Sequence, residues 1–412
     1  MTSSNLRVLF VCHRVPFPPK RGGKIRPFNI IRHLHEQGHD VTVASLARSE
    51  AEMDEADGLG KYCSQRIIEV VNDRIAWPRM VAWLPTARPS SFGYFYSPRL
   101  QQRINQASET GSSSTQRGKS WDLVFVHCSS VAPYVRSVTG NVRIIDFGDI
   151  DSQKWREYSL HKSFPLSAGY WFEAVKLERT ERLLAARFDL ATCTTQAEME
   201  SLRRLGVTGA TAWFPNGVDA EYFQPGSEPY EPDLVTFVGR MDYFPNQQAV
   251  TRFCADILPE IQRRRPGTRF EIVGADPSPE IRKLASLPGV SVTGSVPDVR
   301  PYLTRAALTV APLEIARGTQ NKILESMAMG VPVVCSRQAA GGVDAVPGEH
   351  LLTYETRRQF VDAVLEVLGS GETRARLAIA ARARVLSNHS WHGSMRRVDA
   401  LIASQFAKRA AA

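Results

Sequence analysis

The chain has 412 residues, of which 43% are hydrophobic and 23% charged, and its formal net charge is +9. This length predicts two or three domains, and the composition is typical of a folded globular protein, which excludes a disordered chain. The positive charge is spread over both halves of the chain and accompanies no helix-turn-helix, zinc-finger or RNP-type pattern. We therefore expect no nucleic-acid partner, and anionic lipid and nucleotide diphosphate are the acidic partners left to consider.

The sequence has no run of apolar residues long enough to span a membrane. Its first apolar stretch, residues 8–12, ends at His13 and Arg14, a pattern typical of a strand and not of a signal peptide. The six cysteines are dispersed without a C-x-x-C spacing, which indicates buried thiols in a reducing compartment. We therefore expect a cytoplasmic protein.

The N-terminal half has the pattern of a parallel sheet. A strand at 6–12, a loop rich in proline and glycine at 16–23, a helix at 25–37 and a strand at 41–46 form a strand–helix–strand unit. Further apolar runs predict strands at 66–71, 123–127, 142–147 and 190–194. Residues 108–120 are polar throughout and are predicted to form a mobile surface loop.

A second series of the same kind follows Pro215, Asn216 and Gly217. Its predicted strands lie at 234–238, 269–273, 290–293, 308–311 and 332–335, and its predicted helices at 247–264 and 322–329. We therefore predict an α/β protein with two doubly wound, Rossmann-like domains, 1–213 and 214–389, facing each other across a ligand-binding cleft. A final helix, 390–412, is predicted to pack back on the first domain.

The most informative stretch is residues 311–335, APLEIARGTQNKILESMAMGVPVVC. Gly318 and Thr319 precede a helix whose first turn holds Asn321 and Lys322, so free backbone N–H groups and a cation meet where an anionic diphosphate could bind. Glu325 follows one helical turn after Lys322, where its carboxylate could hold two ribose hydroxyls. On spacing alone, a surface ion pair between Lys322 and Glu325 is an equal alternative.

The same segment resembles a known enzyme family. Residues 324–334, LESMAMGVPVV, are similar to the LEAMAxGxPVV signature of the family 4 retaining glycosyltransferases, which have the GT-B fold. Further resemblance is carried by PNGVD at 215–219 with Phe223 and Pro225, FVGR at 237–240, VTGSVPDV at 292–299, Gly22-Gly23 with GHDV at 38–41, and Ser390-Trp391. The resemblance therefore spans nearly the whole chain.

The resemblance implies roles for individual residues. Glu325 would hold the donor ribose, Arg240 the diphosphate, and Gly22 with Gly23 would form a loop that closes over phosphate or acceptor. His127 matches the family's histidine near the donor sugar, whereas a lone histidine after an apolar strand is more often structural. The complete predicted sets are catalytic His127, Arg240 and Lys322; donor-binding Gly22, Gly23, Arg240, Gly274, Val296, Gly318, Thr319, Gln320, Asn321, Lys322 and Glu325; and acceptor-binding Lys24, Arg26 and Asp149.

Two positions depart from the family pattern. Eight positions before Glu325, where the family has another glutamate, this chain has Arg317, which leaves the identity of the sugar open. Where the family has a lysine five positions after Arg240, this chain has Pro245, followed by Asn246. Because a pre-placed cation lowers the barrier to departure of a diphosphate, we predict that Lys322 replaces the missing lysine, assisted by Arg317.

Two shorter motifs concern the subgroup of the family and a possible metal ion. Residues 239–247, GRMDYFPNQ, with residues 318–330 and 145–155, resemble a bacterial subgroup associated with exosortase and exopolysaccharide gene clusters. Asp149 and Asp151 also form a D-x-D tripeptide, the pattern with which GT-A glycosyltransferases hold a divalent cation. Such tripeptides are common by chance, and we expect these carboxylates to cap the next segment or line the cleft. No metal ion and no cofactor is therefore predicted.

Residues 77–96, WPRMVAWLPTARPSSFGYFY, interleave aromatic rings with Arg79 and Arg88. Rings and cations together suit a lipid headgroup interface, and a lipid-linked acceptor would account for peripheral contact with an anionic membrane at the inner face of the plasma membrane. A packed loop with a few buried rings is an equal alternative.

These patterns predict a hexosyltransferase-type enzyme that moves a sugar from a nucleotide-diphosphate donor to a glycan or lipid-linked acceptor in exopolysaccharide biosynthesis. The resemblance implies retention of anomeric configuration, and a front-face route is preferred because no carboxylate can be assigned as a protein nucleophile. Two alternatives stay open: a catalytically altered nucleotide-sugar-binding protein, which the loss of a family glutamate would fit, and a GT-B nucleotide-sugar epimerase. A phosphorylase would need a lysine for a pyridoxal Schiff base, and none is evident.

Overall fold

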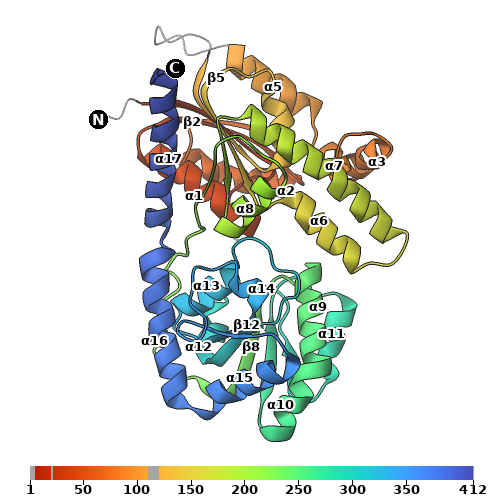
Figure 1. The fold of residues 1–412 in the computed structure, drawn as a ribbon, viewed down its shortest axis with the longest axis vertical. Coiled ribbons are helices and arrows are strands. Elements are labelled where there is room, and N and C mark those ends of the chain that lie inside the picture. Colours follow the sequence, from red (N-terminus) through yellow and green to blue (C-terminus); the bar gives the residue numbers. More distant parts are fainter. Residues whose placement is uncertain (1–4, 20–21, 110–119, 412) are drawn as a thin grey trace. The chain divides into compact units, whose positions relative to one another are not determined.

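The computed structural model describes residues 5–19, 22–109 and 120–411, and it divides into two compact units (Figure 1). Unit 1 comprises Met1–Phe214 and Met395–Ala412, and unit 2 comprises Pro215–Ser394. Each unit has its own parallel sheet and its own buried apolar core.

Unit 1 contains a seven-stranded sheet in the order β3-β2-β1-β4-β5-β6-β7, and every pairing in it is parallel. Its strands are β1 (Arg7–Cys12), β2 (Asp40–Ala47), β3 (Gln65–Val70), β4 (Trp121–His127), β5 (Gly140–Gly148), β6 (Leu190–Cys193) and β7 (Thr211–Trp213). Its helices are α1 (Gly22–Glu36), α2 (Glu50–Glu55), α3 (Asp73–Trp83), α4 (Ser90–Tyr94), α5 (Pro98–Glu109), α6 (Asp151–Leu160), α7 (Leu166–Arg187) and α8 (Gln196–Arg204), with 3-10 turns at Ala56–Lys61 and Ser129–Val135.

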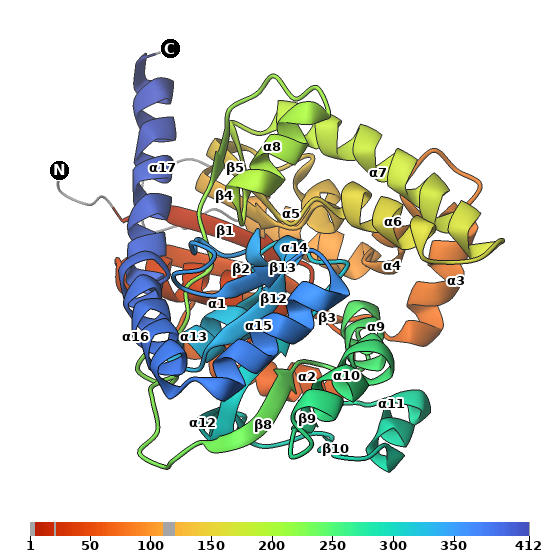
Figure 2. The same cartoon turned by 60° about the horizontal axis from the view of Figure 1, so that its bottom comes forward.

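Unit 2 contains a six-stranded parallel sheet in the order β10-β9-β8-β11-β12-β13. Its strands are β8 (Glu231–Val238), β9 (Arg269–Val273), β10 (Val290–Val292), β11 (Ala306–Ala311), β12 (Val333–Ser336) and β13 (Leu352–Tyr354). Its helices are α9 (Phe244–Arg252), α10 (Leu258–Arg264), α11 (Pro279–Lys283), α12 (Arg300–Arg305), α13 (Asn321–Ala328), α14 (Arg337–Ala340), α15 (Arg357–Gly369) and α16 (Gly371–Asn388), with a π turn at Phe253–Ile257 and a 3-10 turn at Leu284–Ser286. Figure 2 shows α15 lying across strands of this sheet, where it packs on β11, β12 and β13.

The central strands form because their apolar runs are buried on both faces, as parallel sheets require. Residues 8–11 of β1 are completely buried, and β11 is buried along its whole length. In each sheet the strand order reverses once, between β1 and β4 in unit 1 and between β8 and β11 in unit 2. The prediction of two doubly wound sheets is therefore confirmed, and the reversal points mark where ligands are expected.

Several elements differ from the sequence-based expectation. Helix α1 begins at Gly22, inside the stretch expected to be a loop, and the helix expected at 247–264 is interrupted by the π turn. Helix α6 begins at Asp151, the second aspartate of the D-x-D tripeptide, and neither it nor the long helix α7 that follows had a predicted counterpart. The loop predicted at 108–120 falls largely on residues 110–119, outside the described residues.

The last helix, α17 (Trp391–Ala411), begins in unit 2 and continues into unit 1. Within unit 1, Asp399 lies 2.8 Å from Nε2 of His33 on α1, and the guanidinium of Arg397 lies 5.1 Å from the ring of Trp213. Among the helices of residues 5–19, 22–109 and 120–411, none is long and apolar enough to cross a membrane.

Candidate active site

In unit 2 the ends of β8 and β9 approach each other closely. The Gly239 N–H donates to the Val273 carbonyl at 3.0 Å, and the Met241 N–H donates to the Ala275 carbonyl at 2.8 Å. A Cβ added at Gly274 would lie 1.7 Å from the Gly239 carbonyl oxygen, so any side chain there would force the strand ends apart. Gly274, a predicted donor-binding residue, is therefore required by backbone packing whether or not a ligand is bound.

Lys322 lies beside this junction. Its Nζ donates to Oδ1 of Asn246 at 2.5 Å and lies 4.4 Å from the centre of the Phe237 ring. Nδ2 of Asn246 donates in turn to the Arg240 carbonyl at 2.8 Å. Pro245 occupies the position of the family lysine. Asn246, the next residue, thus holds Lys322, the cation that we predicted to replace that lysine.

The environment of Lys322 and Glu325 weakens both charges. Burial lowers the pKa of Lys322 to about 7 and raises the pKa of Glu325 to about 7, and each charge partly offsets the shift of the other. An anionic ligand beside Lys322 would favour its charged form. Binding of a diphosphate near neutral pH should therefore change the protonation of this pair.

The first turn of α13 leaves polar groups without partners. Gly318 has φ of +61°, a left-handed conformation that favours glycine, and α13 begins at Asn321 with no side-chain cap. Oγ1 of Thr319 and Oδ1 of Asn321 are buried without a hydrogen-bond partner among the described residues. The amide of Gln320 is engaged locally, donating to the Arg317 carbonyl at 2.9 Å. Unpaired buried polar groups at a helix N-terminus indicate a ligand supplied from outside the chain.

Arg240 is held by two aspartates that sequence reasoning missed. Its guanidinium pairs with Asp242, 2.6 Å away, and with Asp276, and about a third of its side chain is exposed. Asp276 has φ of +56°, an uncommon conformation for a residue other than glycine. A diphosphate reaching Arg240 would therefore exchange with these carboxylates. Val296, another predicted donor contact, is partly buried against the cluster that includes Val273.

In unit 1 a buried carboxylate organises the ends of the central strands. Asp146 on β5 accepts two hydrogen bonds of 2.8 Å from Arg26 and one of 2.9 Å from Thr192 Oγ1, and it lies 2.8 Å from Nδ1 of His127. Burial alone would raise the pKa of Asp146, but the charge of Arg26 and these hydrogen bonds hold it well below the usual range. Because Asp146 is ionised, Nδ1 of His127 donates to it, which leaves Nε2 as the ring nitrogen available to a ligand.

The other residues predicted in unit 1 are placed differently. Arg26 is 2% exposed, donates to the Phe214 carbonyl at 2.9 Å and stacks on the Phe214 ring, and Lys24 forms a 2.6 Å ion pair with Glu52. Both cations, predicted for acceptor binding, thus lie in internal contacts. Gly23 lies exposed in the first turn of α1, and a Cβ added there would meet nothing within 4 Å.

Comparison with known proteins identifies the family. A family model described as Glycosyltransferase Family 4 matches residues 21–222, and a model described as Glycosyl transferases group 1 matches residues 232–403, so that together they take in most of the chain. The chain belongs to the GT-B glycosyltransferases. A search of curated proteins gave no match.

Solved glycosyltransferase structures share this fold at low sequence identity. The sucrose-phosphate synthase of Thermosynechococcus elongatus matches with a TM-score of 0.67 and 16% identity over 98% of this chain and 100% of its own. HepE of Anabaena, in complex with UDP, matches with a TM-score of 0.66 and 14% identity over 97% of this chain and 100% of its own. HepE in complex with UDP-glucose matches with a TM-score of 0.66 and 13% identity over the same shares. At these identities the likeness concerns the fold alone.

The D-x-D aspartates of this glycosyltransferase are separately engaged. Oδ1 of Asp149 accepts from Thr194 at 3.0 Å, and Asp151, the first residue of α6, accepts from Ser129 at 3.4 Å. Burial is the main cause that raises the pKa of Asp151. Asp149, a predicted acceptor contact, and Asp151 are both partly exposed.

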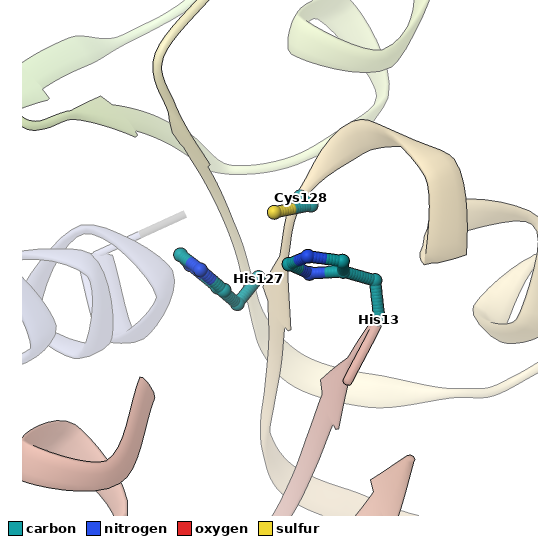
Figure 3. A group of neighbouring side chains, drawn as sticks. All are labelled: His13, His127 and Cys128. Atoms are coloured by element: carbon teal, nitrogen blue, oxygen red, sulfur yellow. The ribbon is translucent and has the colours of Figure 1, made fainter. Parts of the chain in front are cut away.

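Three other side chains of the enzyme are of the types that can bind a metal ion. In the part of the chain that the structure describes, His13, His127 and Cys128 gather at the ends of β1 and β4 with potential ligand atoms within 4.8 Å of one another (Figure 3). Zinc bonds of about 2.0–2.3 Å place tetrahedral ligands roughly 3.5 Å apart, so these side chains would have to move together to enclose an ion. The group does not include Asp149 or Asp151.

Proposed function

We propose that this glycosyltransferase transfers a sugar from a nucleotide-diphosphate donor to a glycan or lipid-linked acceptor, with retention of anomeric configuration and without a metal ion or cofactor. The observation that carries the proposal is the cluster at the start of α13. There, Lys322, held by Asn246, lies next to the buried Thr319 hydroxyl, which lacks a partner in the described chain and can donate to a phosphate oxygen. This combination suits the two phosphates of a nucleoside diphosphate.

The proposed roles follow from the chemistry of the leaving group. As the glycosyl bond breaks, negative charge develops on the diphosphate, and Lys322 with the N–H groups of α13 would stabilise it. Arg240 would add a second cation once it exchanges Asp242 and Asp276 for phosphate. Glu325, one turn along α13, would accept the hydroxyl hydrogens of the ribose. His127, oriented by Asp146, would contact the transferred sugar through Nε2.

Three aspects of the proposal go beyond what the fold alone supports. The donor is proposed to be a UDP-sugar first, because HepE, a similar structure, is in complex with UDP-glucose. A role in exopolysaccharide biosynthesis, on the cytoplasmic side of the membrane, is proposed from the resemblance of residues 239–247 and 318–330 to the exosortase-associated subgroup. Retention is proposed by a front-face route, since no carboxylate in the donor cluster is assigned as a nucleophile.

A donor screen tests the proposal. Calorimetry with UDP-, GDP- and ADP-sugars, with and without EDTA, would be run on the wild type and on Glu325→Ala. We expect one nucleotide sugar to bind, EDTA to leave its affinity unchanged, and the variant to bind at least about tenfold more weakly.

The outcomes separate the alternatives. Binding that requires a divalent ion would contradict metal independence, and absence of binding to every nucleotide sugar would contradict the donor site. Binding without turnover on any acceptor would favour a nucleotide-sugar-binding protein, for which Arg317 in place of the family glutamate is the specific support. A product that forms without an acceptor would favour an epimerase.

A further inference from the structure

Helices α6 and α7 form a hairpin whose end is covered with exposed apolar side chains. Figure 1 shows the two helices running side by side away from the strands of unit 1. Six large apolar residues between positions 160 and 175 of this hairpin are exposed: Leu160 at 80%, Phe164 at 83%, Leu166 at 60%, Trp171 at 46%, Phe172 at 63% and Val175 at 41%. Contiguous exposed apolar side chains of this size mark an interaction surface.

Helix α3 carries a second set. Four of its side chains, or of the residue that follows it, are about half exposed: Ile75 at 52%, Trp77 at 53%, Val81 at 54% and Leu84 at 51%. Within α3, Ala76 is the buried residue. Helix α3 and the α6–α7 hairpin therefore both present apolar side chains to solvent.

Polar contacts fix the two sets next to each other. Glu173 on α7 accepts from the backbone N–H groups of Ser90 and Ser91, at 2.9 and 2.8 Å, just after α3. Lys176, one turn further along α7, donates to the Leu84 carbonyl at 3.3 Å. Figure 1 and Figure 2 both show α3 on the same side of unit 1 as the hairpin. We call the ten exposed side chains of α3, Leu84 and the hairpin the apolar hairpin surface.

The charge around this surface is predominantly positive. Residues 74–108 and 158–172 contain no aspartate or glutamate, but they contain Arg74, Arg79, Arg88, Arg99, Arg103, His161 and Lys162. Of the glutamates of α7, Glu173 and Glu181 are buried, and Glu178, which is about a third exposed, pairs with Arg156. Asp73, the exposed first residue of α3, is a carboxylate next to the surface, and the cations of these two segments outnumber it.

We propose that the apolar hairpin surface docks in the headgroup region of a membrane that carries anionic lipids. Tryptophan and phenylalanine side chains enter the boundary between headgroups and acyl chains, and lysine and arginine beside them meet the lipid phosphates. The excess of cations over carboxylates in these segments favours an anionic lipid surface over a neutral one. This proposal rests on the proposed function in one respect, because a membrane would hold the proposed lipid-linked acceptor. The apolar hairpin surface lies in unit 1 and the donor cluster in unit 2, so the two proposals can be tested separately.

Vesicle binding tests the proposal. Cosedimentation of the full chain with phosphatidylcholine vesicles, with and without phosphatidylglycerol, would compare wild type, Phe164→Ser/Phe172→Ser and Trp77→Ser/Val81→Ser. The matched control is Ile379→Ser/Leu386→Ser, which removes two apolar residues that are 73% and 50% exposed on α16. We expect wild type and control to bind the anionic vesicles, and each surface variant to bind at least about tenfold more weakly. Added salt should weaken the binding of the wild type.

Two results would overturn the proposal. One is that the wild type binds neither kind of vesicle, or that the surface variants bind as it does. The other is that sedimentation equilibrium without lipid shows a wild-type dimer that the surface variants dissociate, which would make the surface a contact between two copies. Calorimetric binding of the nucleotide sugar should be unchanged in all variants, so that misfolding or failure of the donor site is recognised separately.

Discussion

Lys322 shows how a single side chain depends on its surroundings. Its ammonium group is held by Asn246 and lies over the Phe237 ring, in a site that weakens its charge. An isolated cation in such a place is costly unless an anion joins it. A diphosphate beside Lys322 would therefore lower the free energy of keeping its ammonium group charged in this site.

We predict that Lys322→Ala lowers turnover by about 100-fold or more, because the leaving diphosphate loses its nearest cation. Steady-state kinetics with the donor identified in the screen would measure this effect. Arg264→Ala, which removes an exposed arginine paired with Asp362 in the same unit, is the control and should leave kcat unchanged. Near-normal turnover in Lys322→Ala, combined with loss of activity in Arg240→Ala, would show that Lys322 does not replace the family lysine.

Donor affinity should also depend on pH around neutrality. Lys322, with a pKa of about 7, loses its proton as the pH rises, and Glu325, with a pKa of about 7, gains one as the pH falls. Since binding needs the charged form of each, affinity should be greatest near neutral pH, with proton uptake on binding above it and proton release below it. Calorimetry in buffers of different ionisation enthalpy measures both. An affinity that stays constant from about pH 6 to about pH 8.5 would contradict this prediction.

Asp146 is the corresponding residue of unit 1. We expect Asp146→Asn to lower the free energy of unfolding by about 3–5 kcal/mol, because Arg26 would remain buried with its charge unpaired. Urea denaturation measures this, and Asp233→Asn, which breaks a half-exposed pair with Arg265, should cost about 1 kcal/mol or less. Equal losses of unfolding free energy in the two variants would mean that burial of the Asp146 network adds nothing to its contribution to stability.

At the scale of secondary-structure elements, the strands could be read from the sequence and several helices could not. Buried parallel strands are continuous apolar runs, and their short length and flanking turn residues distinguish them from buried helices. Helix α7 has the opposite pattern, since Glu173 and Glu181 are buried while Leu166, Trp171 and Phe172 lie outward. Its inward carboxylates accept hydrogen bonds from Ser90, Ser91 and Ser152, partners distant in the chain. Hydrophobic periodicity cannot detect such a helix.

Two glycine substitutions should separate packing from ligand contact. Gly274→Ala should lower the free energy of unfolding by about 1–3 kcal/mol or more, because its Cβ would overlap the Gly239 carbonyl. Gly23→Ala should raise stability by about 0.5–1 kcal/mol, since it lies in a helix with space around it. If the glycine is needed for close approach of a ligand to α1, Gly23→Ala should still lower turnover. Thermal unfolding with parallel kinetics tests both, and unchanged turnover in stable Gly23→Ala would remove Gly23 from the predicted site.

At the scale of the whole molecule, the sequence by itself determined the two doubly wound sheets and the local donor motif. Lys322 and Glu325 are three residues apart on one helix, so their proximity follows from helical geometry. The loop and helix N-terminus around Gly318 and Asn321 are equally local. These features depend on neighbours in the chain, which a sequence displays directly.

Only the tertiary structure decided which distant side chains complete each site. Asn246 reaches Lys322 across 76 positions, and Arg26 reaches Asp146 across 120. Arg26 and Lys24 carry charge in a glycine-rich segment that suggested an acceptor site, yet the fold turns them to Asp146 and Glu52. Strand order and side-chain direction bring such partners together. The sequence records the charges, whereas the free energy of burying a charge decides where each one finds its counterion.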